Sequence, residues 1–122
     1  MIPAILYVED DPINAFVMVK FLKNDFTITH VIDGETCLNY LTAERVDLIL
    51  MDIHLGKGKM DGIETMKRIK EQPAFSSLPI MAVTSYALPE DRERFLNEGF
   101  DDYMAKPVDR KALIERIHHL LR

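Results

Sequence analysis

The sequence predicts an α/β fold of the doubly wound type, a three-layer sandwich in which one parallel sheet lies between two layers of helices. Short continuous apolar runs rich in Val, Ile, Leu and Met recur along the chain, as expected of strands buried on both faces of a parallel sheet. Segments with apolar residues at helical spacing follow these runs. Five such strands and five helices alternate over residues 1–122, so we expect one domain, (βα)5 in organisation.

The first unit is a strand, a helix and a second strand. Residues 5–8, ILYV, are the first strand, and Asp11 followed by Pro12 marks the start of a helix, with an N-cap and a proline in the first turn. Residues 27–31 alternate apolar with polar side chains, which is typical of an edge strand. We expect the inward face of the helix to be its apolar stripe, namely Ile13, Phe16, Val17, Met18 and Leu22.

The middle of the chain repeats this order. A second helix follows Asp33 and Gly34, and its predicted inward residues are Cys37, Leu38 and Leu41. Residues 46–51 are the most apolar run and predict the central strand. A third helix must end before Pro73, and its predicted inward residues are Ile63, Met66 and Ile69.

Two further strand–helix units complete the pattern. Residues 79–83 and 103–105 are the fourth and fifth strands. Pro89 is suited to start the helix between them, and Gly99 is suited to end it with a left-handed C-cap. Asp109 caps the last helix, whose apolar residues are Leu113, Ile114, Ile117, Leu120 and Leu121.

This alternation predicts where a ligand binds. Right-handed crossovers and the flavodoxin-like strand order 2-1-3-4-5 place strands one and three beside the point where the order reverses, and ligands bind there, beyond the carboxyl ends of the strands. The polar residues that follow strands one, three, four and five are Glu9 and Asp10, Asp52, Thr84, and Lys106. We therefore expect one crevice with carboxylates, a hydroxyl and an ammonium group, a set suited to a divalent cation and a phosphoryl group.

Composition and charge exclude several classes of protein. A hydrophobic fraction of 48% with 29% charged residues is typical of a globular domain, and the net charge of −5 argues against unaided binding to nucleic acid. No signal peptide is recognisable and no apolar run approaches the roughly 20 residues of a membrane span, so we expect a cytoplasmic protein. Cys37 is the only cysteine, which excludes an internal disulfide, and no glycine-rich phosphate loop predicts nucleotide binding.

The clustered acids need a positively charged partner. Three carboxylates within a few ångströms repel one another unless a cation lies between them, and oxygen ligands without cysteine or paired histidines favour Mg²⁺ or Mn²⁺. Asp52 is the strongest indication, because it ends the most apolar strand, where an unpaired charge is costly. Lys106 can pair with a carboxylate or bind phosphate oxygens. The alternative for Glu9 and Asp10 is a solvated acidic loop that caps the first helix, a role that suits Asp11.

Over its whole length the chain resembles the receiver domain of two-component response regulators. The stretches that carry the resemblance are ILYVEDDP, DLILMDIHL with MDGIE, PIMAVTSYA and DDYMAKPV. The resemblance implies a signalling domain rather than an enzyme, which accepts a phosphoryl group from a histidine kinase or histidine phosphotransfer protein and then binds a downstream protein. From charge and composition we expect no direct contact with nucleic acid or membrane, and the resemblance allows a dimer through the face formed by the fourth helix, fifth strand and fifth helix.

The resemblance also implies a role for each residue at the phosphorylation site. Asp52 matches the phosphoacceptor, and Lys106 matches the lysine that binds the phosphoryl group. Glu9 and Asp10 match the acids that serve the magnesium ion, together with Asp52 and the backbone carbonyl of His54.

Four further residues match positions that govern the signal. Thr84 matches the switch hydroxyl, and Tyr103 matches the aromatic residue whose rotamer reports activation. His54 and Tyr86 match positions that tune dephosphorylation. The loop 55–59 departs from the family's pattern, since it is two residues longer than usual and lacks a proline. The sequence leaves open whether this loop affects metal binding or is a glycine-rich surface loop.

Three other classes of protein are alternatives to this reading. A haloacid-dehalogenase-like phosphatase carries its nucleophile in an Asp-x-Asp on the first strand, whereas here the lone aspartate ends the third. A Toprim-like nuclease has a second acid where this chain has His54. A pseudo-receiver that only docks partners would lack an acid, the threonine or the lysine, and none is missing. Because no output segment follows the fifth helix, we expect a stand-alone regulator, a shuttle or part of a larger protein.

Overall fold

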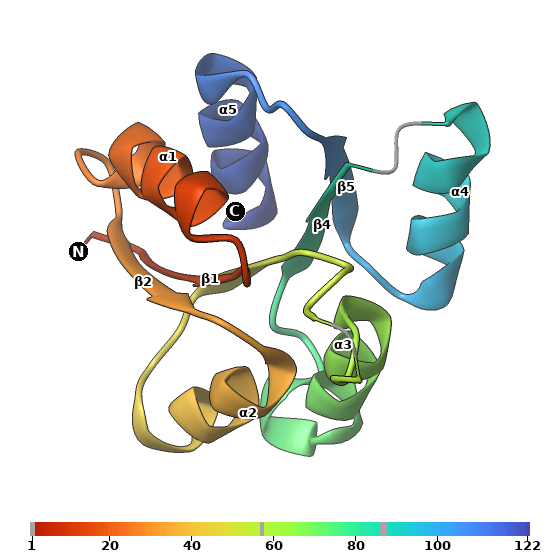
Figure 1. The fold of residues 1–122 in the computed structure, drawn as a ribbon. Coiled ribbons are helices and arrows are strands. Elements are labelled where there is room, and N and C mark those ends of the chain that lie inside the picture. Colours follow the sequence, from red (N-terminus) through yellow and green to blue (C-terminus); the bar gives the residue numbers. More distant parts are fainter. Residues whose placement is uncertain (1, 57, 86–87) are drawn as a thin grey trace.

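The computed structural model describes residues 2–56, 58–85 and 88–122, and it has the predicted doubly wound architecture. Five parallel strands form one sheet in the order β2-β1-β3-β4-β5, as predicted. Helices cover both faces of this sheet (Figure 1). The strands are Ala4–Val8 (β1), Thr27–Val31 (β2), Leu48–Met51 (β3), Ile80–Thr84 (β4) and Asp102–Ala105 (β5). The helices are Pro12–Leu22 (α1), Gly34–Ala43 (α2), Gly62–Glu71 (α3), Pro89–Glu98 (α4) and Arg110–Leu120 (α5).

Aspartate side chains start most of the helices. Asp11, Asp33, Asp61 and Asp109 each accept a hydrogen bond from a backbone N–H in the first turn of the helix that follows. The predicted N-caps of α1 and α5 are therefore confirmed, and so are the start of α4 at Pro89 and its end before Gly99.

Some predicted bounds are wrong by one or two residues. β3 begins at Leu48 rather than at residue 46, and the side chain of Asp47, just before the strand, accepts a hydrogen bond from Ala4 N at 2.8 Å. β4 spans Ile80–Thr84 rather than 79–83, since Pro79 has no N–H to donate to the sheet. β5 includes Asp102, and a short 3₁₀ helix at Pro73–Phe75 was not predicted.

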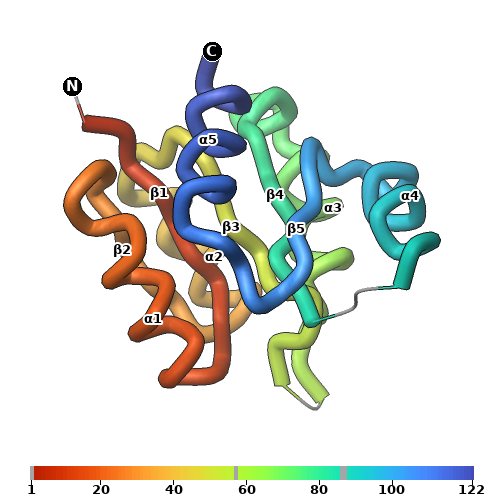
Figure 2. Tube along the Cα trace, turned by 90° about the horizontal axis from the view of Figure 1, so that it is seen from above, coloured from red at the N-terminus to blue at the C-terminus, as the bar shows by residue number. Residues whose placement is uncertain are grey.

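Two apolar layers, one on each face of the sheet, form the core. One contains residues of α1 and α5, and the other contains residues of α2, α3 and α4. α1 and α5 lie side by side on their face (Figure 2). Within the described part of the chain, no helix is long and apolar enough to span a membrane.

The predicted inward face of α1 is wrong in part. Met18 and Leu22 are buried as expected, but Ile13, Phe16 and Val17 are exposed by 73%, 64% and 43%. Nearly the whole circumference of α1 is apolar, so helical spacing alone does not select the side that faces the sheet. In α3, by contrast, polar residues separate the apolar ones, and Met66 and Ile69 are buried as predicted.

Candidate functional site

The sheet topology brings the predicted site residues to one edge. β1 and β3 are neighbours with Val8 opposite Met51, so the acids that follow these strands lie next to one another. β4 and β5 are also neighbours, and Lys106 N donates to Thr84 O at 2.8 Å. Residues far apart in the sequence thus meet at the carboxyl ends of the strands, as expected for a parallel sheet.

Three carboxylates form a compact cluster at this edge. Oxygen atoms of Glu9, Asp10 and Asp52 all lie within 4.8 Å of one another. Glu9 and Asp52 are buried, whereas Asp10 is exposed. An oxygen-only set of this size and charge fits Mg²⁺ or Mn²⁺.

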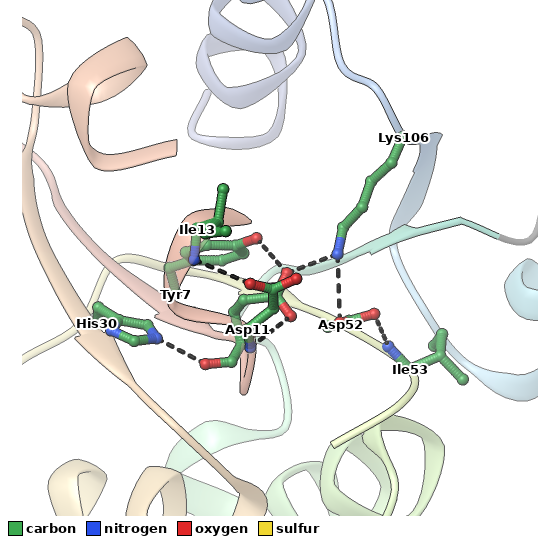
Figure 3. Close-up of polar contacts among 8 residues, drawn as sticks. Tyr7, Asp11, Ile13, His30, Asp52, Ile53 and Lys106 are labelled. Atoms are coloured by element: carbon green, nitrogen blue, oxygen red, sulfur yellow. Dashed lines mark hydrogen bonds and ion pairs between the residues drawn. The ribbon is translucent and has the colours of Figure 1, made fainter. Parts of the chain in front are cut away.

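Lys106 is the ammonium group that faces this cluster. Its Nζ lies 2.5 Å from Glu9 Oε1 and 3.2 Å from Asp52 Oδ2 (Figure 3). The other oxygen of Asp52, Oδ1, accepts a hydrogen bond from Ile53 N at 2.7 Å. One lysine therefore contacts two of the three carboxylates.

Crowding at the site changes its protonation. Burial, reinforced by the neighbouring Glu9 carboxylate, raises the pKa of Asp52 from 3.8 to about 7, although Lys106 opposes the shift. Burial alone would raise the pKa of Glu9 as well, but hydrogen bonds with Asp52, Lys106 and Tyr7 hold it below its ordinary value. Burial acts to lower the pKa of Lys106, and the two carboxylates outweigh burial and raise it. Around neutral pH, Asp52 thus takes up a proton more readily than Glu9 does.

Two residues that sequence reasoning missed hold Glu9. The Tyr7 hydroxyl donates to Glu9 Oε1 at 2.7 Å, and His30 Nε2 lies 2.6 Å from the Glu9 carbonyl oxygen (Figure 3). A signal for Tyr7 exists in the sequence, because a phenol in a buried strand needs a polar partner and a residue two positions away is on the same side of the strand.

The remaining predicted residues surround the cluster. Thr84 is fully buried at the end of β4. Tyr103 is only 9% exposed, and its ring stacks on Phe95 of α4 with the centroids 5.8 Å apart. His54 is exposed in the loop after β3, and the predicted role of its carbonyl stays a prediction. Tyr86 lies outside the described residues.

The long loop after Asp52 is built against the site. Leu55 is buried, and a Cβ atom on Gly56 would stand 3.9 Å from Asp10 Oδ2. Lys59 Nζ lies 3.3 Å from Asp33 Oδ2, which ties the end of the loop to the start of α2. The loop therefore borders the acids, rather than projecting away from them.

The start of α3 is pressed against the backbone of Asp52. A Cβ atom on Gly62 would lie 2.1 Å from the Asp52 carbonyl oxygen, so no larger residue fits there without displacement. Gly62 N also donates to Ile53 O at 2.8 Å. The absence of a side chain at Gly62 thereby lets the start of α3 pack directly on the backbone of Asp52.

Comparisons with known proteins agree with this geometry. The model of the response regulator receiver domain family matches residues 5–118. An uncharacterized 14.6 kDa protein of Leptolyngbya boryana is 36% identical, over 93% of this chain and 86% of its own length. The phosphate regulon transcriptional regulatory protein PhoB of Escherichia coli is 35% identical over 97% of this chain, which spans only 51% of PhoB.

A solved structure is similar over the same range. The receiver domain of the sensor histidine kinase PA1611 from Pseudomonas aeruginosa superposes with a TM-score of 0.88 at 34% identity, covering 99% of this chain and 98% of that domain. That crystal structure has a magnesium ion coordinated in its active site cleft.

Proposed function

This chain belongs to the response regulator receiver domain family of two-component signal transduction, and on that premise we propose that it accepts a phosphoryl group on Asp52 and changes its surface in response. The observation that carries the proposal is the cluster of Glu9, Asp10 and Asp52 with Lys106 against it. We further propose that residues 1–122 are a single receiver domain that acts in the cytoplasm, as a signalling domain and not as an enzyme on other substrates.

The metal in this proposal is Mg²⁺ or Mn²⁺. Glu9, Asp10 and Asp52 would hold it, with the carbonyl of His54 as a further ligand. When bound, it offsets the charge of the carboxylates and of the phosphoryl oxygens. The magnesium ion in the receiver domain of PA1611 supports this choice of cofactor.

The proposed reaction moves a phosphoryl group from a phosphohistidine. A carboxylate oxygen of Asp52 forms the new P–O bond while the P–N bond breaks, and the imidazole keeps the electron pair and takes up a proton. Lys106, 3.2 Å from Asp52, pairs with the phosphoryl oxygens. Water later hydrolyses the acyl phosphate, and we propose that His54 and Tyr86 tune that rate.

The response to phosphorylation passes through Thr84 and Tyr103. The Thr84 hydroxyl binds a phosphoryl oxygen and moves with its loop, which biases the side chain of Tyr103. Tyr103 already packs on Phe95 in this structure, so phosphorylation acts by raising the population of that packed state. The surface of α4, β5 and α5 then binds a downstream protein or a second copy of the chain.

The exposed apolar residues of α1 are proposed to bind the phosphodonor. A donor protein must bring its histidine to Asp52 and thereby covers the surface around the site. Ile13, Phe16 and Val17 are exposed on α1, and Val17 lines the same pocket of about 260 Å³ as Lys106 and Pro107. Phe16→Ser should slow transfer from a phosphohistidine protein about tenfold and leave labelling by acetyl phosphate unchanged. Equal loss with both donors would contradict this role.

Labelling tests the central proposal. Acetyl phosphate with Mg²⁺ should add one phosphoryl group that is labile to alkali and hydroxylamine, and Asp52→Asn should abolish it. Asp47→Asn, an acid at the other end of β3, is the matched control and should label normally. A labelled Asp52→Asn protein overturns the assignment, unless peptide mapping places the label on a neighbouring hydroxyl. A wild-type protein that never labels favours a docking-only module.

A further inference from the structure

The buried carboxylate of Glu9 has two donors on one oxygen. Glu9 Oε1 accepts from the Tyr7 hydroxyl at 2.7 Å and from Lys106 Nζ at 2.5 Å (Figure 3). Glu9 is 1% exposed and Tyr7 is fully buried, so water does not replace either donor without a rearrangement. Both lone pairs of this oxygen are thereby used.

The proposed phosphotransfer disturbs this arrangement. Lys106 contacts Glu9 in the structure, but in the proposed reaction it pairs with a phosphoryl group on Asp52. If it turns away, Glu9 Oε1 loses its charged donor. A buried carboxylate oxygen left without any donor is strongly destabilised, and no buried side-chain N or O among the described residues lacks a partner.

We propose that Tyr7 is a positioning residue for phosphotransfer, whose hydroxyl keeps Glu9 Oε1 hydrogen-bonded when Lys106 moves to the phosphoryl group. This inference rests on the proposed function. Tyr7 acts only through Glu9, which it holds in place beside Asp10 and Asp52 while the lysine changes partner.

The surroundings of Tyr7 suit a constant donor. Its ring lies in the apolar layer between the sheet and the helices α1 and α5, where Met18, Leu50 and Leu113 are also buried. Its side chain is fully buried, and its hydroxyl lies within hydrogen-bonding distance of Glu9 Oε1, so packing holds both the ring and the donor. Lys106, in contrast, is attached by a flexible chain and is part-exposed. One donor is thus fixed and the other is able to move.

Beryllofluoride, which mimics a phosphoryl group on an aspartate, gives a direct test. In the presence of Mg²⁺, Tyr7→Phe should bind beryllofluoride about tenfold more weakly than the wild type, since no hydrogen-bond donor then holds Glu9 Oε1 in place and the carboxylate is poorly positioned beside Asp10 and Asp52. Tyr40→Phe is the matched control, because it removes a hydroxyl that bonds Thr29 away from the site, and it should bind as the wild type does.

Measuring Tyr7→Phe in a Glu9→Gln background distinguishes a positioning role of Tyr7 from a merely structural one. An amide oxygen tolerates the loss of a donor better than a carboxylate does. Tyr7→Phe should therefore weaken beryllofluoride binding only about twofold in Glu9→Gln. An unchanged tenfold effect in that background would overturn the proposed link through Glu9.

A measurement on the wild type covers the case in which Tyr7→Phe does not fold. NMR of the Lys106 Nζ and of the hydroxyl-bearing ring carbon of Tyr7 should show, on adding beryllofluoride, that the lysine changes partner while Tyr7 stays hydrogen-bonded. A lysine that stays on Glu9 contradicts the inference. If the wild type binds beryllofluoride and Tyr7→Phe binds it equally, only the role of Tyr7 fails, whereas a wild type that neither labels nor binds beryllofluoride removes the proposed function itself.

Discussion

The two ends of the sheet hold their acids in different ways. At the amino end, each of three acids is paired with at least one cation: Asp47 with Arg45, Asp101 with Lys70, and Asp102 with Arg92 and Arg116. At the carboxyl end, three acids gather within 4.8 Å of one another, and Lys106 is the cation that the described residues bring to them. The negative charge of the acids is fully compensated at the amino end and is in excess at the carboxyl end.

This difference indicates that the carboxylates at the amino end have a structural role, whereas those at the carboxyl end have a functional one. The paired acids also accept backbone hydrogen bonds, as Asp47 does from Ala4 and Asp101 from Ile80, so they fasten the first residues of strands. The acids at the carboxyl end repel one another, and this repulsion stabilises neither the strand ends nor the loops. A further cation would stabilise such a cluster, and its excess negative charge therefore supports the proposed binding of an ion there.

Replacing Asp52 should give the largest difference between the two ends. In the folded state the pKa of Asp52 rises from 3.8 to about 7, so the folded protein binds the proton more tightly than the unfolded chain does. Its contribution to stability is therefore fully present below about pH 4 and is lost as the pH rises to about 7. Without metal at pH 8, Asp52→Asn should raise the free energy of unfolding by a few kcal/mol, given about 1.36 kcal/mol per unit of pKa.

Urea unfolding in EDTA at pH 5 and pH 8 measures this effect. The wild type should lose stability between the two conditions, and Asp52→Asn should lose much less. Asp102→Asn, at the balanced end, should keep the wild-type dependence on pH. If Asp52→Asn were less stable than the wild type at pH 8, the charge of Asp52 would not destabilise the carboxyl end of the sheet.

Adding Mg²⁺ should restore the balance at the carboxyl end. A ligand that binds only the folded state adds about 2.7 kcal/mol when present at 100 times its Kd. The wild type and Asp102→Asn should gain this amount, and removal of the metal with EDTA should reverse it. Asp10→Asn and Asp52→Asn should gain less, since each lacks one of the clustered oxygens. Equal gains in all four proteins would mean that the ion binds elsewhere.

Breaking the ion pairs of Asp102 tests the amino end. Asp102 is buried, and its Oδ1 accepts from Tyr103 N at 2.8 Å as well as from Arg116 at 2.8 Å. Asp102→Ala should cost about 1–3 kcal/mol of unfolding free energy, because it removes the buried carboxylate that accepts from Tyr103 N and pairs with Arg116. The same loss should appear with and without Mg²⁺ in thermal or urea unfolding, and a loss that Mg²⁺ removes would tie Asp102 to the other end.

Much of this molecule follows from local patterns in the sequence. Alternating apolar runs and helical segments predict the strand order, and aspartate caps predict where α1 and α5 begin. The exposed face of α1 could not be predicted. The helix is apolar nearly all round, so the spacing of its apolar residues does not distinguish the buried face from the exposed one. The partners Tyr7 and Phe95 were also missed, since their contacts with Glu9 and Tyr103 depend on how side chains pack and not on spacing.

The predicted site residues met as expected because each follows a strand of a parallel sheet, so topology alone brings Glu9, Asp52 and Lys106 together. Hydrogen-bond geometry does not follow in the same way. That one oxygen of Glu9 takes donors from both Tyr7 and Lys106 depends on side-chain directions that a strand pattern does not contain.

The smallest effect on stability is expected for Lys70 at the amino end of the sheet, and Lys106 at the carboxyl end provides the comparison. Lys70 Nζ lies 2.6 Å from Asp101 Oδ2, but that oxygen also accepts from Ile80 N at 2.8 Å, and Asp101 is exposed. Lys70→Met should therefore cost about 0.5 kcal/mol, and less in 1 M salt, since the carboxylate keeps a backbone donor and contact with water. Lys106→Met leaves Glu9 and Asp52 without their cation, so it should steepen the loss of stability between pH 5 and pH 8. Urea unfolding of both variants at low and high salt measures the contrast, and equal, salt-independent costs would show that the two ends do not differ in charge balance.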